Sequence, residues 1–325
     1  MYKKSIGLLF LFCFLVNSIV VNEVKIDKPI CNILVLSGGG SYSALQLGIL
    51  SKIYLPYYDV ITAVSGGVMN AAILQYYNSE LDNYSFTKGI NYLKNLYSVI
   101  KTKNLYTANY YKIYKNWGIF DNSASKYLLN ILLLNLKYPI DKKPVYIGLT
   151  NINELKLDIF KLDDYDIQNQ IKIITASTSI PFFFGPVNIN NTHYTDGILV
   201  ADEVIMGLEN FIKCNKYNIT YISANLINKE INITNVKEYT NRLFDIIIRT
   251  TLNSVYNLIS FDVNNVNNNE KKYKCNKNNS KTELYYYYPT YENLNNEYYQ
   301  LDFDKSSELF TIGENNYDYK KVNVC

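Results

Sequence analysis

Two short apolar segments of this chain each end in a glycine-rich turn, and a helical pattern follows each turn. The first segment, Ile33–Leu36, leads into Gly38–Gly40, and the second, Val60–Ala63, leads into a turn built around Ser65. Small residues around a serine suit a tight strand-to-helix turn that exposes the hydroxyl, and a glycine-rich loop can aim backbone N–H groups at an oxygen where negative charge develops. The two turns therefore predict a nucleophile and an oxyanion hole.

The alternation of strand and helix around these turns indicates the fold class. We expect strands at Asn32–Leu36 and Asp59–Val64, followed by helices at Ser43–Tyr54 and Gly66–Tyr77. A βαβα order predicts a parallel sheet covered by helices, with functional residues at the carboxyl ends of the strands.

Hydrophobic patterns and turn residues predict the remaining elements. Residues 78–143 are expected to be helical. The expected helices include Ser123–Leu136, Gln168–Ser179 and Val236–Phe261, and the expected strands are Pro144–Thr150, Lys156–Leu162, Val187–Ile189, Thr192–Thr195, Tyr217–Leu226 and Tyr285–Tyr288. The Asn- and Lys-rich stretch 264–281 predicts a solvated loop. Trp117 is interpreted as a core anchor.

Three ordered motifs resemble the signature of the patatin-like phospholipase family. The GGGx[RK]G loop of that family corresponds to Gly38–Gly40, its GxSxG turn to the turn at Ser65, and its DG[GA] motif to Asp196 and the glycine after it. The stretch Ala176–Val187 resembles the ASxxIPxxFPPV segment that precedes the aspartate motif. The resemblance runs from about residue 31 almost to the end of the chain, and the ordered set is far more specific than any one motif. It implies a three-layer α/β/α fold with a central, mostly parallel sheet.

A serine hydroxyl needs a neighbouring base, which is usually a histidine. The chain contains one histidine, His193. If Asp196 ends a strand, His193 points to the opposite face because side chains alternate along a strand, so a triad of these residues is geometrically awkward. The resemblance implies instead a Ser-Asp dyad in which Asp196 contacts Ser65 directly. His193 is interpreted as a partly buried strand residue.

The oxyanion hole is assigned to the glycine-rich loop. The amides of Gly39 and Gly40, together with Gly38 or Ser41, are expected to stabilise the oxyanion. The positive N-terminal end of the helix that starts near Gly66 adds to this stabilisation. The chemistry requires no metal and no cofactor.

Three positions depart from the family pattern. Ala63 stands where the nucleophile motif begins with Gly, Tyr42 replaces the Arg or Lys of the loop, and Ser43 replaces the Gly after it. Because Ser65 and Asp196 are both present, the resemblance implies a lipid acyl hydrolase that cleaves fatty-acyl esters of phospholipids or neutral lipids at a membrane or micelle surface. The alternative is a catalytically inactive patatin-fold protein that binds lipid or a partner, because its altered loop no longer holds the oxyanion.

The N-terminus predicts a secretory signal. Lys3 and Lys4 precede an apolar run, Ile6–Val16, and then a polar pair, which is the order of a signal peptide spanning residues 1–18. An uncleaved signal anchor is the alternative, since Ile19–Val21 would lengthen the apolar stretch. The predicted organisation is then one patatin-like domain at 29–325 with its core motifs in 33–205, in a protein secreted or held in the lumen of the secretory pathway or anchored to a membrane.

Composition agrees with one globular domain outside the cytosol. The chain has 325 residues, 48% of them hydrophobic and 19% charged, with a formal net charge of +3, so it can bury a large core and carries no nucleic-acid footprint. Five N-glycosylation sequons fit a secreted glycoprotein: Asn83, Asn190, Asn218, Asn232 and Asn278.

Four cysteines remain once Cys13 of the leader is set aside. They are Cys31, Cys214, Cys275 and Cys325. In an oxidising compartment they can form two disulfides, with three connectivities that the sequence leaves open. Metal binding is less favoured because no two of them have CxxC spacing and the chain has a single histidine.

Overall fold

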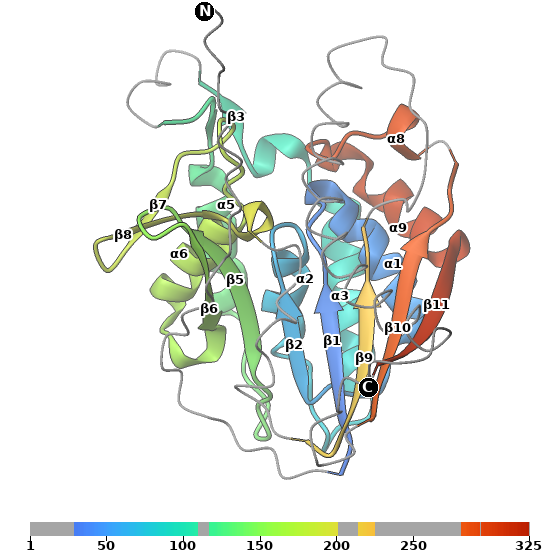
Figure 1. Cartoon of the computed structure of the whole chain (residues 1–325). Helices are drawn as coiled ribbons and strands as arrows, with labels where there is room; N and C mark the ends of the chain where they lie inside the picture. The colour runs from blue at the N-terminus through green and yellow to red at the C-terminus, as the bar shows by residue number, and fades with distance from the viewer. Residues whose placement is uncertain (1–28, 110–116, 201–213, 225–280, 293, 325) are drawn as a thin grey trace, which may run out of the picture.

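A mixed, mostly parallel sheet forms the centre of the molecule (Figure 1). The structure is a computed structural model and describes residues 29–109, 117–200, 214–224, 281–292 and 294–324. The strands lie in the order β11-β10-β9-β1-β2-β5-β8-β7, and β6 pairs with β5 beside that path. Their bounds are β1 Cys31–Leu36, β2 Val60–Ala63, β5 Val145–Asn151, β6 Lys156–Lys161, β7 Val187–Ile189, β8 Thr192–Asp196, β9 Lys216–Ile222, β10 Lys281–Pro289 and β11 Tyr317–Val324.

The five strands from β10 to β5 in this order run parallel, and β6, β7, β8 and β11 are joined to the sheet by antiparallel pairing. The residues of β2 and β5 are all buried, and β1 is buried apart from one half-buried residue. Continuous apolar strands of this kind belong to parallel sheets that are covered on both faces. The fold is the predicted three-layer α/β/α arrangement.

Helices flank the sheet in Figure 1. Their bounds are α1 Ser43–Ile53, α2 Gly67–Leu74, α3 Ser85–Val99, α5 Ser123–Leu134, α6 Ile167–Ser177, α8 Leu294–Glu297 and α9 Ser306–Asn315. The N-terminus of α6 is capped by Asp166, whose side chain accepts a hydrogen bond from the Asn169 amide at 2.8 Å. The helix ends shortly before Pro181, as the restriction on the residue before proline predicts. No helix within the described ranges is long and apolar enough to cross a membrane.

Most predicted elements are confirmed, including the tyrosine-rich strand in β10 and the hairpin that ends at Asp196. The expectation of a wholly helical segment at 78–143 is wrong in part. Between α3 and α5 the chain forms a short antiparallel ribbon in which β3, Thr107–Ala108, pairs with β4, Phe120–Asp121. This ribbon lies above the carboxyl ends of the parallel strands in Figure 1.

A disulfide joins Cys31 at the start of β1 to Cys214 just before the neighbouring strand β9, with the two Cα atoms 6.0 Å apart. Cys275 and Cys325 lie outside the described residues, as do the predicted leader, the predicted helix at 236–261 and nearly all of the predicted loop at 264–281. The disulfide closes a loop with a sequence separation of 183 residues and fixes the amino ends of β1 and β9 together.

Candidate active site

Ser65 occupies the sharp turn between β2 and α2. Its backbone φ is 50°, a left-handed conformation that costs free energy for a residue with a Cβ. The Ser65 amide donates to Ser177 Oγ at 3.1 Å, and Ser177 Oγ donates to the Gly148 carbonyl on β5 at 2.8 Å. The end of α6 therefore connects the nucleophile turn to the central sheet.

Asp196 lies at the end of β8 and contacts the serine directly. Ser65 Oγ donates to Asp196 Oδ2 at 2.7 Å, and the Ile198 amide donates to Asp196 Oδ1 at 3.1 Å. Thr150 Oγ1 donates to the Asp196 backbone carbonyl at 2.8 Å, which fixes the strand end against β5. The structure thus brings together the two residues that the sequence assigns to a dyad, although they are 131 residues apart.

Burial raises the pKa of the Asp196 carboxyl to about 7, because the ionised form loses its hydration. The hydrogen bonds from the Ile198 amide and the Ser65 hydroxyl oppose this shift without cancelling it. A carboxyl with this pKa exchanges protons near neutral pH, which suits a general base.

The glycine-rich loop lies against the nucleophile turn. A Cβ added to Gly66 would come within 2.6 Å of the Gly40 nitrogen, so the two backbones meet where no side chain fits. Gly40 has φ 55°, and Gly40, Ser65 and Gly66 line the same pocket. Within the described part of the chain, the amides of Gly39 and Gly40 donate no hydrogen bond. These amides are free to bind an oxyanion.

The amides of Ser41 and Gly38, the other two proposed donors of the loop, differ from those of Gly39 and Gly40. The Ser41 amide donates to the Gln300 carbonyl at 2.6 Å. The expectation that Ser41 contributes to the oxyanion hole is therefore wrong, because its N–H is already engaged. Gly38 precedes the segment that lines the pocket, and its carbonyl accepts a hydrogen bond from Ser37 Oγ at 3.0 Å.

Two of the three positions that depart from the family pattern, Tyr42 and Ser43, are buried in the core. Tyr42 is fully buried, and its hydroxyl donates to the Tyr298 carbonyl at 3.3 Å. Ser43 Oγ lies 2.9 Å from the Tyr97 hydroxyl, which in turn donates to Asn70 Oδ1 at 2.9 Å. These substitutions connect the loop to neighbouring elements and leave Gly40 beside Gly66.

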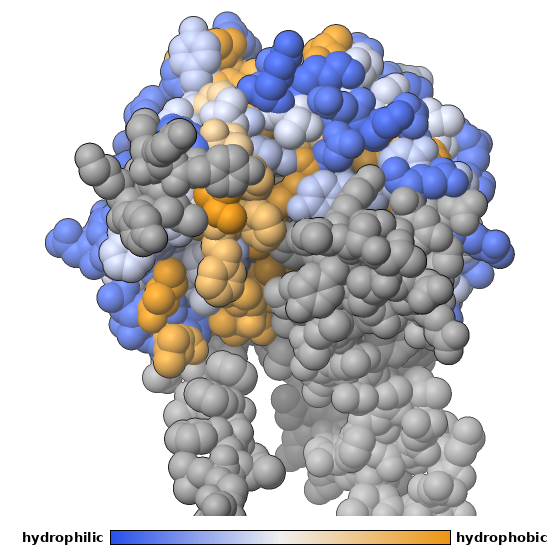
Figure 2. Space-filling view, turned by 90° about the horizontal axis from the view of Figure 1, so that it is seen from above, coloured by the Kyte–Doolittle hydropathy of each residue, from blue (hydrophilic) through white to orange (hydrophobic). Residues whose placement is uncertain are grey.

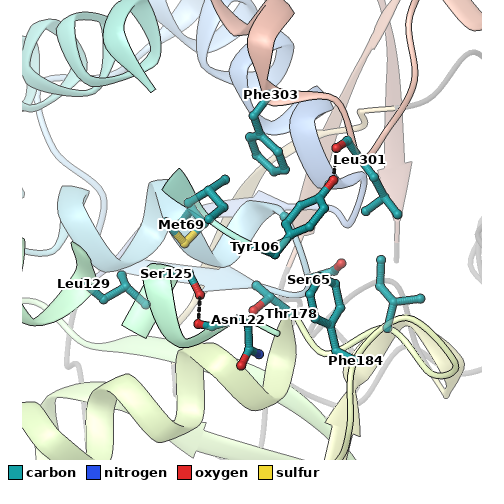
Figure 3. A pocket seen from close by; sticks show the side chains of 14 residues that line it. Ser65, Met69, Tyr106, Asn122, Ser125, Leu129, Thr178, Phe184, Leu301 and Phe303 are labelled. Atoms are coloured by element: carbon teal, nitrogen blue, oxygen red, sulfur yellow. Dashed lines mark hydrogen bonds between the residues drawn. The ribbon is translucent and has the colours of Figure 1, made fainter. Parts of the chain in front are cut away.

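A pocket of about 70 Å³ opens over Ser65 (Figure 3). One water molecule needs roughly 10–15 Å³ of such a cavity, so the pocket has room for several waters or a short apolar group. Its walls are mostly apolar, and the polar side chains among them are Ser65, Asn122, Ser125, Thr178 and Tyr106. The apolar lining residues are Met69, Leu105, Leu129, Ile180, Phe184, Leu301 and Phe303.

Of the residues that the structure describes, those that line this pocket include no His, Asp, Glu or Lys side chain, and Asp196 is connected to the pocket through its hydrogen bond with Ser65. His193 is exposed on β8 and does not line the pocket, so the expectation that it is partly buried is wrong, whereas the expectation that it lies away from the serine is confirmed. Among the described residues, no group of three His, Cys, Asp or Glu side chains could hold a metal ion.

Sequence reasoning missed two residues of the site. Ser177 lies within the stretch that resembles the family motif, but its bond to the Ser65 amide depends on packing that no local pattern encodes. The sequence analysis assigns Gly66 to the positive N-terminal end of a helix, and not to a hydrogen-bond donor of the oxyanion hole. The rule that the amide after a nucleophilic serine can bind the oxyanion would have identified it.

Comparison with known proteins agrees with this geometry. A family model described as patatin-like phospholipase matches residues 34–207, which is more than half of the chain. The chain belongs to this family. The matched segment of this patatin-like protein begins in β1 and contains the glycine-rich loop, Ser65 and Asp196.

Two individual proteins resemble this patatin-like protein. "Probable lipid hydrolase 463L" of Invertebrate iridescent virus 6 is 28% identical over 184 residues, which cover 50% of this chain and 58% of that protein. Among solved structures, the "Crystal structure of VipD from Legionella pneumophila" matches with a TM-score of 0.36 and 13% identity, over 90% of this chain and 68% of that one.

Proposed function

We propose that this patatin-like protein hydrolyses fatty-acyl esters of lipids, with Ser65 as nucleophile and Asp196 as general base. The observation that carries the proposal is the 2.7 Å hydrogen bond from Ser65 Oγ to the buried Asp196 carboxylate beside an apolar pocket. Family membership and the name of the viral relative support the same class of substrate.

In the proposed first step Ser65 Oγ attacks the ester carbonyl carbon while its proton moves to Asp196 Oδ2. The amides of Gly39 and Gly40, and that of Gly66, stabilise the negative oxygen of the tetrahedral intermediate. The C–O bond of the ester then breaks, and the departing alcohol takes the proton from Asp196. An acyl-enzyme at Ser65 remains.

In the second step a water molecule attacks the acyl carbonyl. Asp196 takes a proton from this water, the bond to Ser65 Oγ breaks, and the serine recovers its proton as the fatty acid leaves. Only the ionised form of Asp196 can act in either step, so activity depends on a carboxyl whose pKa is about 7.

The test compares release of fatty acid from phospholipid vesicles and of p-nitrophenol from a soluble ester by the parent protein, Ser65→Ala and Asp196→Asn. Both variants should lower turnover by about a thousandfold or more. Ser98→Ala, at an exposed serine on α3, is the matched control and should keep parental activity. A folded parent that turns over neither substrate, or a Ser65→Ala variant as active as the parent, would refute the enzyme proposal and favour the non-catalytic alternative.

We also propose that the protein works outside the cytosol, in the secretory pathway or beyond the cell. The disulfide between Cys31 and Cys214 supports this location because disulfides persist in oxidising compartments. Thiol labelling of the protein from its native source, before and after reduction, tests it. Free Cys31 and Cys214 in freshly isolated protein would contradict it.

A further inference from the structure

Two large aromatic side chains on neighbouring backbone segments are exposed to solvent. Trp117 is 77% exposed and Phe182 is 83% exposed, so the expectation that Trp117 is a core anchor is wrong. Gly118 pairs with Phe182 in a parallel bridge, and the Ile119 amide donates to the Phe182 carbonyl at 3.1 Å. These backbone contacts hold the segments that carry the two rings side by side.

The fold holds both residues in an unfavourable conformation. Trp117 has φ 57° and Phe182 has φ 69°, and a left-handed backbone is disfavoured for bulky side chains. A Cβ on Gly118 would lie 2.7 Å from the Gly185 nitrogen, so only glycine lets the two segments approach this closely. Strain together with exposure of two aromatic rings lowers stability and solubility, which points to a use for the rings outside the folded core.

The segments that carry the pair continue into residues that line the catalytic pocket. Phe182 belongs to the same short loop as Ile180 and Phe184, which line the pocket, and Trp117 precedes β4 and helix α5, which supplies Leu129 to the pocket wall. Ribbon β3–β4 lies at the top of the molecule in Figure 1, and apolar side chains gather on the face seen from above in Figure 2. On α5, Tyr127 is also exposed.

Two exposed lysines lie close in sequence to residues that line the pocket. Lys103 is two residues before Leu105 and Lys126 follows Ser125, and the Ser125 amide donates to the Leu105 carbonyl at 3.1 Å. Both lysines are exposed and form no ion pair with any described residue. In the C-terminal segment, Asp302 and Asp304 accept hydrogen bonds from Thr102, the residue before Lys103.

We propose that this face docks on a phospholipid bilayer that carries anionic head groups, with Trp117 and Phe182 inserted at the interface and Lys103 and Lys126 facing lipid phosphates. Tryptophan and other aromatic rings favour the level of the head groups, and lysines near an anionic leaflet add electrostatic attraction. The proposal rests on the proposed function in one respect, since a pocket at the docked face would receive its lipid ester directly from the bilayer.

Trp117 is the only tryptophan of the chain, so intrinsic fluorescence reports on this face alone. The experiment mixes the full chain with vesicles of non-hydrolysable diether phosphatidylcholine, with and without diether phosphatidylglycerol. We expect a blue shift of the emission and quenching by brominated lipid, both stronger with phosphatidylglycerol and weakened by salt. Unchanged emission with both vesicle types, or a shift of equal size with both, would overturn the proposal.

Variants separate this face from the rest of the surface. Phe182→Asn and Trp117→Asn remove the rings, and Asn tolerates a left-handed backbone, so folding is preserved. In sedimentation with the same vesicles the double variant should bind about tenfold more weakly, because two rings no longer leave water. Ile140→Asn, at a 99% exposed residue just before the amino end of β5, is the matched control and should bind like the parent.

The remaining outcomes also decide the matter. Weaker binding by the Ile140 variant than by the double variant would place the docking face at the opposite end of the sheet and overturn the proposal. So would concentration-dependent dimerisation that the double variant abolishes without a change in vesicle binding, since the occupant would then be a second copy of the chain. Ser65→Ala should bind vesicles like the parent, and a parent that binds diether vesicles without hydrolysing a soluble ester would refute the enzyme proposal alone.

Discussion

Replacing Asp196 by Asn should stabilise the folded protein at neutral and alkaline pH while it abolishes hydrolysis. The Asn side chain is isosteric with the protonated carboxyl and can keep both hydrogen bonds, accepting from the Ile198 amide and donating to Ser65 Oγ. It differs from the parent in one respect, since it never carries a buried negative charge. The cost of that charge is what the variant removes.

The size and sign of the effect follow from the pKa. A carboxyl whose pKa rises from 3.8 in the unfolded chain to about 7 in the folded protein corresponds to about 4 kcal/mol. Below pH 3.8 both states hold the proton, and the folded state keeps the full benefit of the neutral group. As the pH rises towards 7 the unfolded chain releases its proton first, so the free energy of unfolding falls, and above about 7 no further change occurs.

Urea unfolding followed by circular dichroism at pH 4 and pH 8 measures this difference. We expect the free energy of unfolding of Asp196→Asn, relative to the parent, to grow by about 4 kcal/mol between the two pH values. Other titrating groups are common to both proteins and cancel in the comparison. A difference that stays constant with pH would refute the reasoning, because Asp196 would then titrate alike in the folded and unfolded states.

Three further predictions concern the same site and its support. Turnover of a soluble ester should rise with pH with a midpoint of about 7 as Asp196 ionises, and a midpoint near 4 would contradict its role as the base. Ser177→Ala should lower the free energy of unfolding by about 1–3 kcal/mol, because it leaves the Ser65 amide and a carbonyl on β5 unpaired. It should also lower kcat more than it raises KM, whereas an unchanged kcat would show that Ser177 does not position the nucleophile. Cys31→Ser should destabilise the protein by about 2–4 kcal/mol in denaturant titrations, and Cys214→Ser should match it, since each removes the same cross-link. Unequal losses would mean that one cysteine acts outside this pair.

Ser65 and Asp196 could be predicted because each sits in a local motif whose geometry is set by neighbouring residues. Ser65 follows an apolar strand and precedes small residues, and Asp196 ends a hairpin before Gly197. Their contact spans 131 residues, and strand register accounts for it. Strand β8 runs antiparallel to β5 and pairs only with its last residues, so Asp196 lies beside Leu149, while Ala63, two residues before Ser65, lies beside Ile147. The central parallel strands could also be predicted from local sequence, because their apolar runs are uninterrupted.

Trp117 shows where such reasoning fails. Tryptophan is highly buried on average, and nothing in the adjacent sequence indicates exposure. Its position depends on the close approach of Gly118 to the loop around Phe184, a contact between segments more than 60 residues apart in sequence. The engagement of the Ser41 amide by Gln300 is another long-range contact of this kind. Local patterns fix which residues can react, whereas tertiary contacts fix which backbone groups remain free.

The Gln300 carbonyl that holds the Ser41 amide lies far beyond the family match at 34–207. The buried Tyr42 hydroxyl likewise bonds to the carbonyl of Tyr298, so the turn that carries Gly40 is supported by the C-terminal part of the chain. The motifs that define the family are therefore not a module that can be moved alone. A chimera that transplants only the signature-bearing half would carry the reactive side chains without the distant contacts that shape the oxyanion loop, so engineering has to move the signature together with this support.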